Sequence, residues 1–152
     1  MIDLFTQQYT GVRWKYAFEP KGVSIGEFVQ YAPNKGLVIE RDGTQGDLTG
    51  FKRLYQIDMP AGGGKVVKHL ALDMIAIPDP NGIAAGTGLP GDVGLGNPFA
   101  FPFQTIESVL VLAPNVVAVM NDNNYPFDFG RHVNPRIAAD NEMILVKLPN
   151  AL

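Results

Sequence analysis

The sequence contains no cysteine, which excludes disulfide bonds and thiolate metal sites but is compatible with a reducing or an oxidising compartment. It has no run of eighteen or more apolar residues, so no membrane-spanning helix is expected. The opening stretch "MIDLFTQQYTG" lacks the basic and then apolar layout of a signal peptide, so these residues alone predict no export. Fifteen acidic and twelve basic side chains give a net charge of −3, which argues against nucleic acid as a partner.

Helical periodicity is also absent. No segment of ten or more residues carries an amphipathic helical stripe, while apolar residues alternate or run continuously in short segments between seventeen glycines and twelve prolines. With 152 residues and an apolar fraction of 46%, the chain is long enough for one domain with a core, and we expect that domain to be all-β. The predicted strands are Val12–Phe18, Gly26–Tyr31, Gly36–Glu40, Phe51–Asp58, Val66–Asp73, Ile106–Leu112, Val116–Met120 and Glu142–Leu148. Residues 78–102 are rich in glycine and proline and are predicted to form a surface loop.

The sequence contains an internal repeat. Residues 24–43 align without a gap on residues 105–124, an offset of 81 residues, the difference between 24 and 105. Each copy reads as a strand, a tight "APN" turn, and a second strand that runs into a polar cluster, "ERDG" in the first copy and "NDNN" in the second. The aligned positions that are identical are Ile25/Ile106, Ala32/Ala113, Pro33/Pro114, Asn34/Asn115 and Val38/Val119.

A further strand follows each copy, and "AGGGK" is a hairpin signal that joins a fourth strand to the first copy. Four antiparallel strands that recur as a unit are typical of a β-propeller blade. We therefore predict a partial propeller of about two four-stranded blades, with repeats at about 24–75 and 105–148, within a single domain of residues 1–152. The segment Val12–Phe18 reads as the outer strand of a preceding blade. Because a propeller needs at least four blades, the prediction is a C-terminal piece of a longer protein, or a protomer that self-associates through its open sheet edges.

Three stretches resemble the phytase-like propeller family described as having esterase-like activity of phytase. They are "RWKYAFEPKGVSIGEFVQYAPNKGLVIERDGTQGDLTGFKRLYQIDM", "NPFAFPFQTIESVLVLAPNVVAVMNDNNYPFDFGRH" and "DNEMILVKL". The resemblance implies a bacterial exported propeller, periplasmic or extracellular, of roughly twice this length or more. It also implies a phosphate ester as substrate and bound calcium ions that polarise a water molecule.

Asparagine, aspartate and glutamate supply the hard oxygen ligands that Ca²⁺ prefers. On the resemblance, the expected calcium ligands are Glu40, Asp42, Asn121, Asp122 and Asn123. The expected contacts to phosphate oxygens are Arg41 and Arg131, and Glu107 and Glu142 are second-tier candidates. No catalytic residue is assigned.

Other interpretations of these residues stay open. Asparagine and aspartate are also common turn formers, so "NDNN" has a structural reading beside the ligand reading. His69 is expected to be an ordinary strand residue and His132 a surface imidazole. "GVSIG" matches the serine-hydrolase elbow and "GTGLPG" the dinucleotide-binding motif, but neither is followed by a predicted helix, so both are rejected.

The sequence therefore predicts a calcium-dependent, phytase-like phosphoester hydrolase, or a piece of one. The alternative is a non-catalytic, metal-stabilised propeller segment with a structural or binding role. Whether the chain is an active enzyme by itself is left open.

Overall fold

The computed structural model describes residues 1–152 and is all-β, as predicted. Its one helical segment is the 3₁₀ turn η1, Gly130–His132. No helix is long and apolar enough to cross a membrane. Seven of the strands form two antiparallel sheets that have the form of propeller blades, and four two-residue strands form two small pairs.

The first sheet has the strand order β4-β5-β6-β8. Its strands are β4 (Ser24–Ala32), β5 (Lys35–Arg41), β6 (Lys52–Asp58) and β8 (Val67–Asp73). Pro33 and Asn34 form the two-residue turn between β4 and β5, and Asn34 adopts the left-handed conformation, with φ of 57°. Asparagine tolerates this conformation better than most residues, which explains why the "APN" sequence reverses the chain here.

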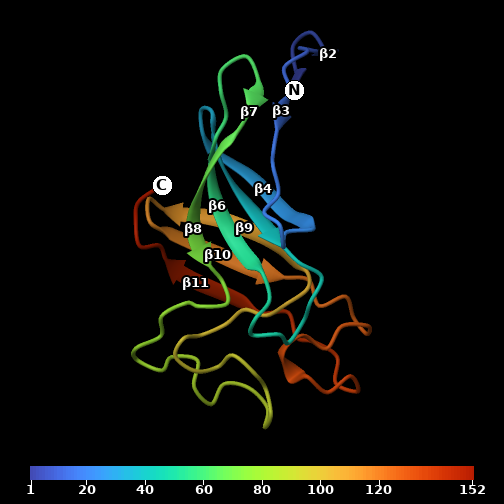
Figure 1. Cartoon of the computed structure of the whole chain (residues 1–152), viewed down its shortest axis with the longest axis vertical. Helices are drawn as coiled ribbons and strands as arrows, with labels where there is room; N and C mark the ends of the chain where they lie inside the picture. The colour runs from blue at the N-terminus through green and yellow to red at the C-terminus, as the bar shows by residue number, and fades with distance from the viewer.

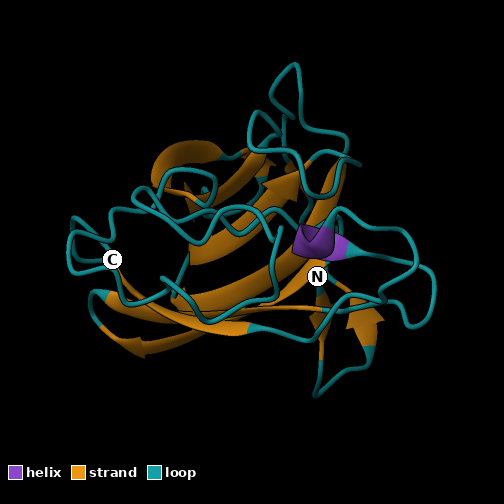
Figure 2. Ribbon diagram, turned by 90° about the horizontal axis from the view of Figure 1, so that it is seen from below, coloured by secondary structure: helices purple, strands orange, loops and turns teal.

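The second sheet has the order β11-β10-β9 and repeats the first three strands of the first sheet. Its strands are β9 (Ile106–Ala113), β10 (Val116–Asn121) and β11 (Met143–Lys147). It has three strands where the first sheet has four. Figure 1 shows this sheet crossing one face of the first sheet, with the loops gathered at the lower end of both. Figure 2, seen from that end, shows the loops and the 3₁₀ turn in front of the strands.

The main core lies between the two sheets. Leu37, Ile39 and Leu54 of the first sheet belong to one buried cluster with Val117 and Val119 of the second. Complete burial of such side chains stabilises the fold by about 1.5–3 kcal/mol each. The period-two apolar pattern of each strand produces this core, because alternate side chains point to the same face.

The inner strands β4 and β9 approach each other closely at Gly26. A Cβ atom placed there would lie 1.9 Å from the carbonyl oxygen of Ile106. Only glycine allows this backbone approach, so Gly26 sets the distance between the two sheets.

The N-terminal segment corrects the prediction of a strand at Val12–Phe18. Only β3 (Trp14–Lys15) is a strand, and it pairs in parallel with β7 (Gly64–Lys65) inside the glycine-rich turn between β6 and β8. The side chains of Trp14 and Tyr16 pack against a second buried cluster on the outer face of the first sheet. The segment therefore covers this sheet and does not form a regular strand over the whole of Val12–Phe18. Before it, β1 (Ile2–Asp3) and β2 (Gln8–Tyr9) form a short hairpin.

The loop at residues 78–102 is irregular, as predicted, but only part of it lies on the surface. Residues 80–91 are almost all exposed, whereas Phe99 and Phe101 are buried in the main core. The rings of Phe101 and Phe103 meet edge to face, with their centroids 4.8 Å apart. The C-terminal end of the loop therefore belongs to the core, because the alternating side chains of Phe99, Phe101 and Phe103 are buried there.

Candidate functional site

The polar clusters of the two repeats lead into loops that contact one another. The loop after β5 places Gln45 against the loop after β10, where its Oε1 accepts hydrogen bonds from the amides of Phe129 and Gly130 at 2.9 and 2.8 Å. The amide of Gly46 donates to the carbonyl of Pro102 at 2.8 Å. These contacts hold the loops together at one end of the two sheets (Figure 1).

Glu40 is completely buried at the end of β5. Its carboxylate accepts hydrogen bonds from Tyr16 Oη at 2.5 Å, from the Glu19 amide at 2.6 Å and from Lys68 Nζ at 2.8 Å. Lys68 Nζ also lies 2.9 Å from Glu19 Oε1. Burial opposes the charged ammonium, but the hydrogen bonds to Glu40 and Glu19 outweigh it, so the pKa of Lys68 is raised. Burial and the hydrogen bond to Glu40 raise the pKa of Tyr16 well above its ordinary value. The Glu40 carboxylate therefore fastens the N-terminal segment to the first sheet.

Asp42 is held by an equally buried lysine. Nζ of Lys52 is fully enclosed and contacts Asp42 Oδ1, the Asp42 carbonyl at 3.3 Å, the Thr44 carbonyl at 2.8 Å and Thr44 Oγ1 at 3.4 Å. The second carboxylate oxygen accepts the amide of Phe51 at 2.8 Å. Burial alone would raise the pKa of Asp42, but the hydrogen bonds from Lys52, the Phe51 amide and Thr44 outweigh it and lower that pKa. An ammonium group thus occupies the space among four oxygens.

The side chains of the "NDNN" cluster bond mainly to backbone groups. Asn121 is buried; its amide group donates to the Asp140 carbonyl at 3.0 Å and accepts from the Glu142 amide at 2.7 Å. Oδ1 of Asp122 accepts the amide of Asn124 at 3.0 Å, two residues on. Oδ1 of Asn123 accepts the amide of Tyr125 at 3.2 Å in the same way. The bonds of Asp122 and Asn123 are those of Asx turns, the structural alternative predicted for this cluster, whereas Asn121 binds residues 19 and 21 positions away.

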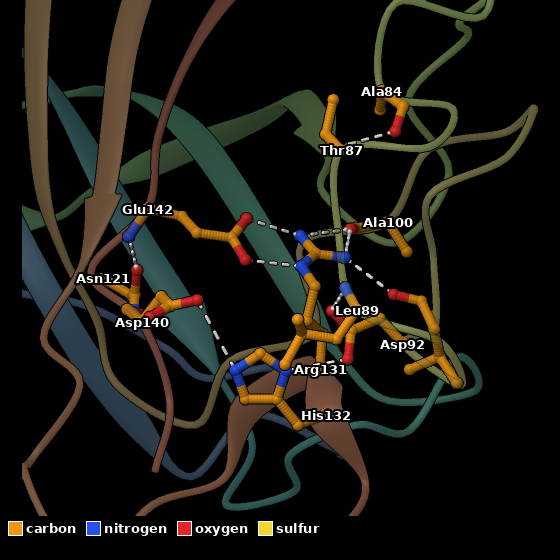
Figure 3. Close-up of polar contacts among 11 residues, drawn as sticks. Ala84, Thr87, Leu89, Asp92, Ala100, Asn121, Arg131, His132, Asp140 and Glu142 are labelled. Carbon is orange, nitrogen blue, oxygen red and sulfur yellow. Dashed lines mark hydrogen bonds and ion pairs between the residues drawn. The ribbon is translucent and has the colours of Figure 1, made fainter. Parts of the chain in front are cut away.

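Arg131, which is buried, forms an ion pair with the partly exposed Glu142 (Figure 3). Nε and Nη2 of Arg131 bind the two carboxylate oxygens of Glu142 at 2.5 and 2.7 Å, and Nη1 donates to the carbonyl of Val93 at 2.6 Å. The remaining N–H groups point at the carbonyl of Ala100 at 3.4 Å. All the donors of Arg131 therefore have internal partners, and this guanidinium has none left for a phosphate group.

His132 is buried beside this pair, which corrects the prediction of a surface imidazole. Its Nδ1 lies 2.7 Å from Asp92 Oδ1 and its Nε2 lies 3.5 Å from Asp140 Oδ2 (Figure 3). Burial would raise the pKa of Asp92, but the hydrogen bonds from His132 and the Leu89 amide outweigh it, so that pKa is lowered. Asp92, Asp140 and Glu142 line a cleft of about 660 Å³. No sequence signal marked Asp92, because it lies forty residues before His132 in the irregular loop. His69 is an exposed residue of β8, as predicted.

Arg41 is the other predicted phosphate contact and lies at the end of β5, close to the start of β9. Its Nη2 binds Glu107 Oε1 at 3.0 Å, and Glu107 is 41% exposed. Arg41 is itself buried, and its Nε is the one buried side-chain nitrogen or oxygen without a hydrogen-bond partner. A buried donor without a partner in the chain is available to a water molecule or to a ligand.

The predicted ligands do not form a calcium site in this arrangement. No group of three or more acidic or histidine side chains is placed to hold a metal ion. Lys68 and Lys52 bind the carboxylates of Glu40 and Asp42, and Asn121 is bound on both sides by backbone. Only Asp122 is exposed and keeps a carboxylate oxygen without an internal partner. The five residues therefore do not fit a shared calcium ion while these ion pairs are formed.

Comparison with known proteins gives one relationship. No curated protein and no solved structure matches the chain. The family model named phytase-like, esterase-like activity of phytase, matches residues 1–125 of the 152. This match includes both polar clusters and the Arg41–Glu107 pair. The chain belongs to the phytase-like family.

Proposed function

We propose that the chain serves the hydrolysis of phosphate esters, as a phytase-like enzyme or as part of one, with Arg41 as the contact to the phosphoryl group. Membership of the phytase-like family supports a hydrolase of this kind. The observation that carries the residue assignment is the guanidinium of Arg41, which is buried, bound through Nη2 to Glu107, and left with an unpartnered Nε.

The chemistry of the reaction suits this pair. Water attacks phosphorus, the ester P–O bond breaks, and the leaving alcohol takes up a proton while inorganic phosphate is released. Charge on the phosphoryl oxygens is stabilised by a positioned guanidinium, which remains ionised at any working pH. Glu107, partly exposed and 3.0 Å from Arg41, is placed to accept a proton from the attacking water.

For calcium, we propose fewer ligands than the five that the resemblance implies. Among the predicted ligands, only Asp122 presents an unpartnered carboxylate oxygen to solvent, so a calcium ion would bind at the surface of this loop. Binding to Glu40 or Asp42 requires Lys68 or Lys52 to move away first. When bound, calcium supplies Lewis-acid polarisation of a phosphoryl oxygen or water. The roles proposed for Arg41 and Glu107 do not depend on this ion.

Turnover of a chromogenic phosphate ester, with calcium or with chelator, tests the proposal. Arg41→Gln should lower kcat/KM by about 100-fold, the typical effect of losing one donor to a developing charge. Arg136→Gln, at an exposed arginine after the 3₁₀ turn, is the matched control and should retain parent activity. Equal activity of the parent and of folded Arg41→Gln would remove Arg41 from the site.

The second candidate is a non-catalytic propeller segment with a structural or binding role. The pairing of Lys52 with Asp42 and of Lys68 with Glu40 favours it, because two of the three predicted metal carboxylates are neutralised within the fold. Phosphate binding by calorimetry without ester turnover, lost in Arg41→Gln, would indicate this role. The export that the resemblance implies, to the periplasm or outside the cell, belongs to the same proposal and is tested by cell fractionation.

A further inference from the structure

The second sheet exposes one apolar face. The side chains on this face, from β9, β10 and β11, include Leu110 and Leu145, which are 58% and 65% exposed. No charged side chain lies among its central positions, and every large side chain there is aliphatic. We call this surface face A; it consists of Leu110, Leu112, Ala118, Met120, Met143 and Leu145.

The internal repeat shows what face A is shaped to contact. Strand pairing places Leu37 and Ile39 of β5 at the positions of Ala118 and Met120 in β10, and Leu54 at the position of Met143. In the first sheet these equivalent side chains are buried in the core against the second sheet. The complete equivalent set is Val29, Tyr31, Leu37, Ile39, Leu54 and Gln56.

The surface that covers this set is the opposite face of the second sheet. It includes Val109, Val117, Val119 and Val146, all buried in the same cluster. By the same equivalence, the corresponding face of the first sheet contains Phe28, Gly36, Val38, Tyr55 and Ile57, which we call face B. The surface of the first sheet that is equivalent to face A therefore packs, within one chain, against the surface of the second sheet that is equivalent to face B.

Face B is only partly covered. Trp14 and Tyr16 pack on it, but Phe28 remains 46% exposed. An apolar hollow of about 580 Å³ lies between the N-terminal segment and the sheet, lined by residues that include Phe28, Val38 and Ile57. The molecule therefore has an exposed apolar face at one end of its stack of sheets and an apolar hollow at the other.

We propose that face A binds face B of a second copy of this chain, head to tail, so that the packing between the two sheets of one chain is continued between chains. The two surfaces differ, so the contact is heterologous, and its repetition closes into a ring or extends into a filament. The proposal is independent of whether the chain hydrolyses phosphate esters.

Light scattering and sedimentation of the purified chain over a range of concentrations test the assembly. We expect mass to increase with concentration. Leu145→Lys on face A and Phe28→Lys on face B should each raise the dissociation constant by about tenfold or more, because each places a charge in an apolar contact. Phe127→Lys, at an 85% exposed loop position outside both faces, is the control and should assemble like the parent.

Mixing the two variants distinguishes head-to-tail packing of face A on face B from packing of face A on face A. Leu145→Lys retains face B and Phe28→Lys retains face A, so a mixture should form dimers that stop at two copies, while each variant alone stays monomeric. Thermal melts check that both variants are folded. A parent chain that is monomeric at high concentration overturns the proposal. Assembly that survives Phe28→Lys but not Leu145→Lys means that face A binds face A, and this result also overturns it.

Discussion

The buried contact between Asp42 and Lys52 predicts that Asp42→Asn destabilises the protein without any metal ion. The ammonium of Lys52 is fully enclosed, and the Asp42 carboxylate is its only charged partner. The substitution keeps an oxygen near Nζ but removes the countercharge. If Asp42 served only as a calcium ligand, the same substitution would leave the metal-free protein unchanged.

The size of the effect follows from burial. Loss of one member of a buried ion pair costs about 3–5 kcal/mol. Asp42 is 17% exposed and the asparagine still accepts a hydrogen bond, so we expect about 2–3 kcal/mol for this change. For a chain of this size, that loss lowers Tm by roughly 5–10 °C.

Thermal and urea unfolding in chelator measure the effect. Asp122→Asn is the control, because that exposed carboxylate accepts one local amide and its change should alter stability by less than about 0.5 kcal/mol. Lys52→Met and the double variant complete a cycle in which the two single costs should not add. An Asp42→Asn protein that melts like the parent in chelator would refute the reasoning.

The same pair predicts a dependence on pH. The pKa of Asp42 is lowered in the folded protein, so its contribution to stability is complete above the unfolded value of about 3.9. It is lost as the pH falls through the folded pKa. The stability difference between the parent and Asp42→Asn should therefore shrink below about pH 4, and a constant difference from pH 7 to pH 2 would contradict this.

Two further substitutions test the packing and the second ion pair. Gly26→Ala places a methyl group against the Ile106 carbonyl and should cost roughly 3 kcal/mol or more in urea unfolding, whereas Gly43→Ala, with open space around it, should be nearly neutral. Glu142→Gln removes the countercharge of buried Arg131 and should cost about 2–4 kcal/mol, so a melting temperature equal to the parent's would show that this pair contributes little.

The strands of both sheets were predictable because alternation reports which side chains share a buried face. The same pattern predicted a strand at Val12–Phe18, where Trp14 and Tyr16 do share a buried face. Alternation does not report which backbone groups pair, however, and here only Trp14 and Lys15 find a partner, in β7. The extent of that strand depends on a contact with a turn fifty residues away, which local sequence does not encode.

The candidate site was predictable in its residue types but not in its partners. Lys52 lies opposite Arg41 in the register of β5 and β6, so its position beside Asp42 follows once that register is known. Lys68 reaches Glu40 from β8, two strands away, and no local pattern marks it. Carboxylates in a sequence indicate oxygen ligands, but whether a metal or an ammonium binds them is decided by such distant neighbours.

The repeat adds a reason to look for chemistry at Arg41. Glu40 and Asn121 occupy equivalent positions, both are buried, and both accept a backbone amide, from Glu19 and from Glu142 respectively. Two different side chains at one repeat position thus have the same structural role, because each binds the end of its strand to a neighbouring segment. The next equivalent positions diverge: Asp122 forms an exposed turn, whereas Arg41 is buried with an unpartnered donor. At the position of Glu40 and Asn121, both copies form their hydrogen bonds within the fold. At the position of Arg41 and Asp122, the donor of Arg41 is left without a partner, so a ligand of this chain should be sought at Arg41.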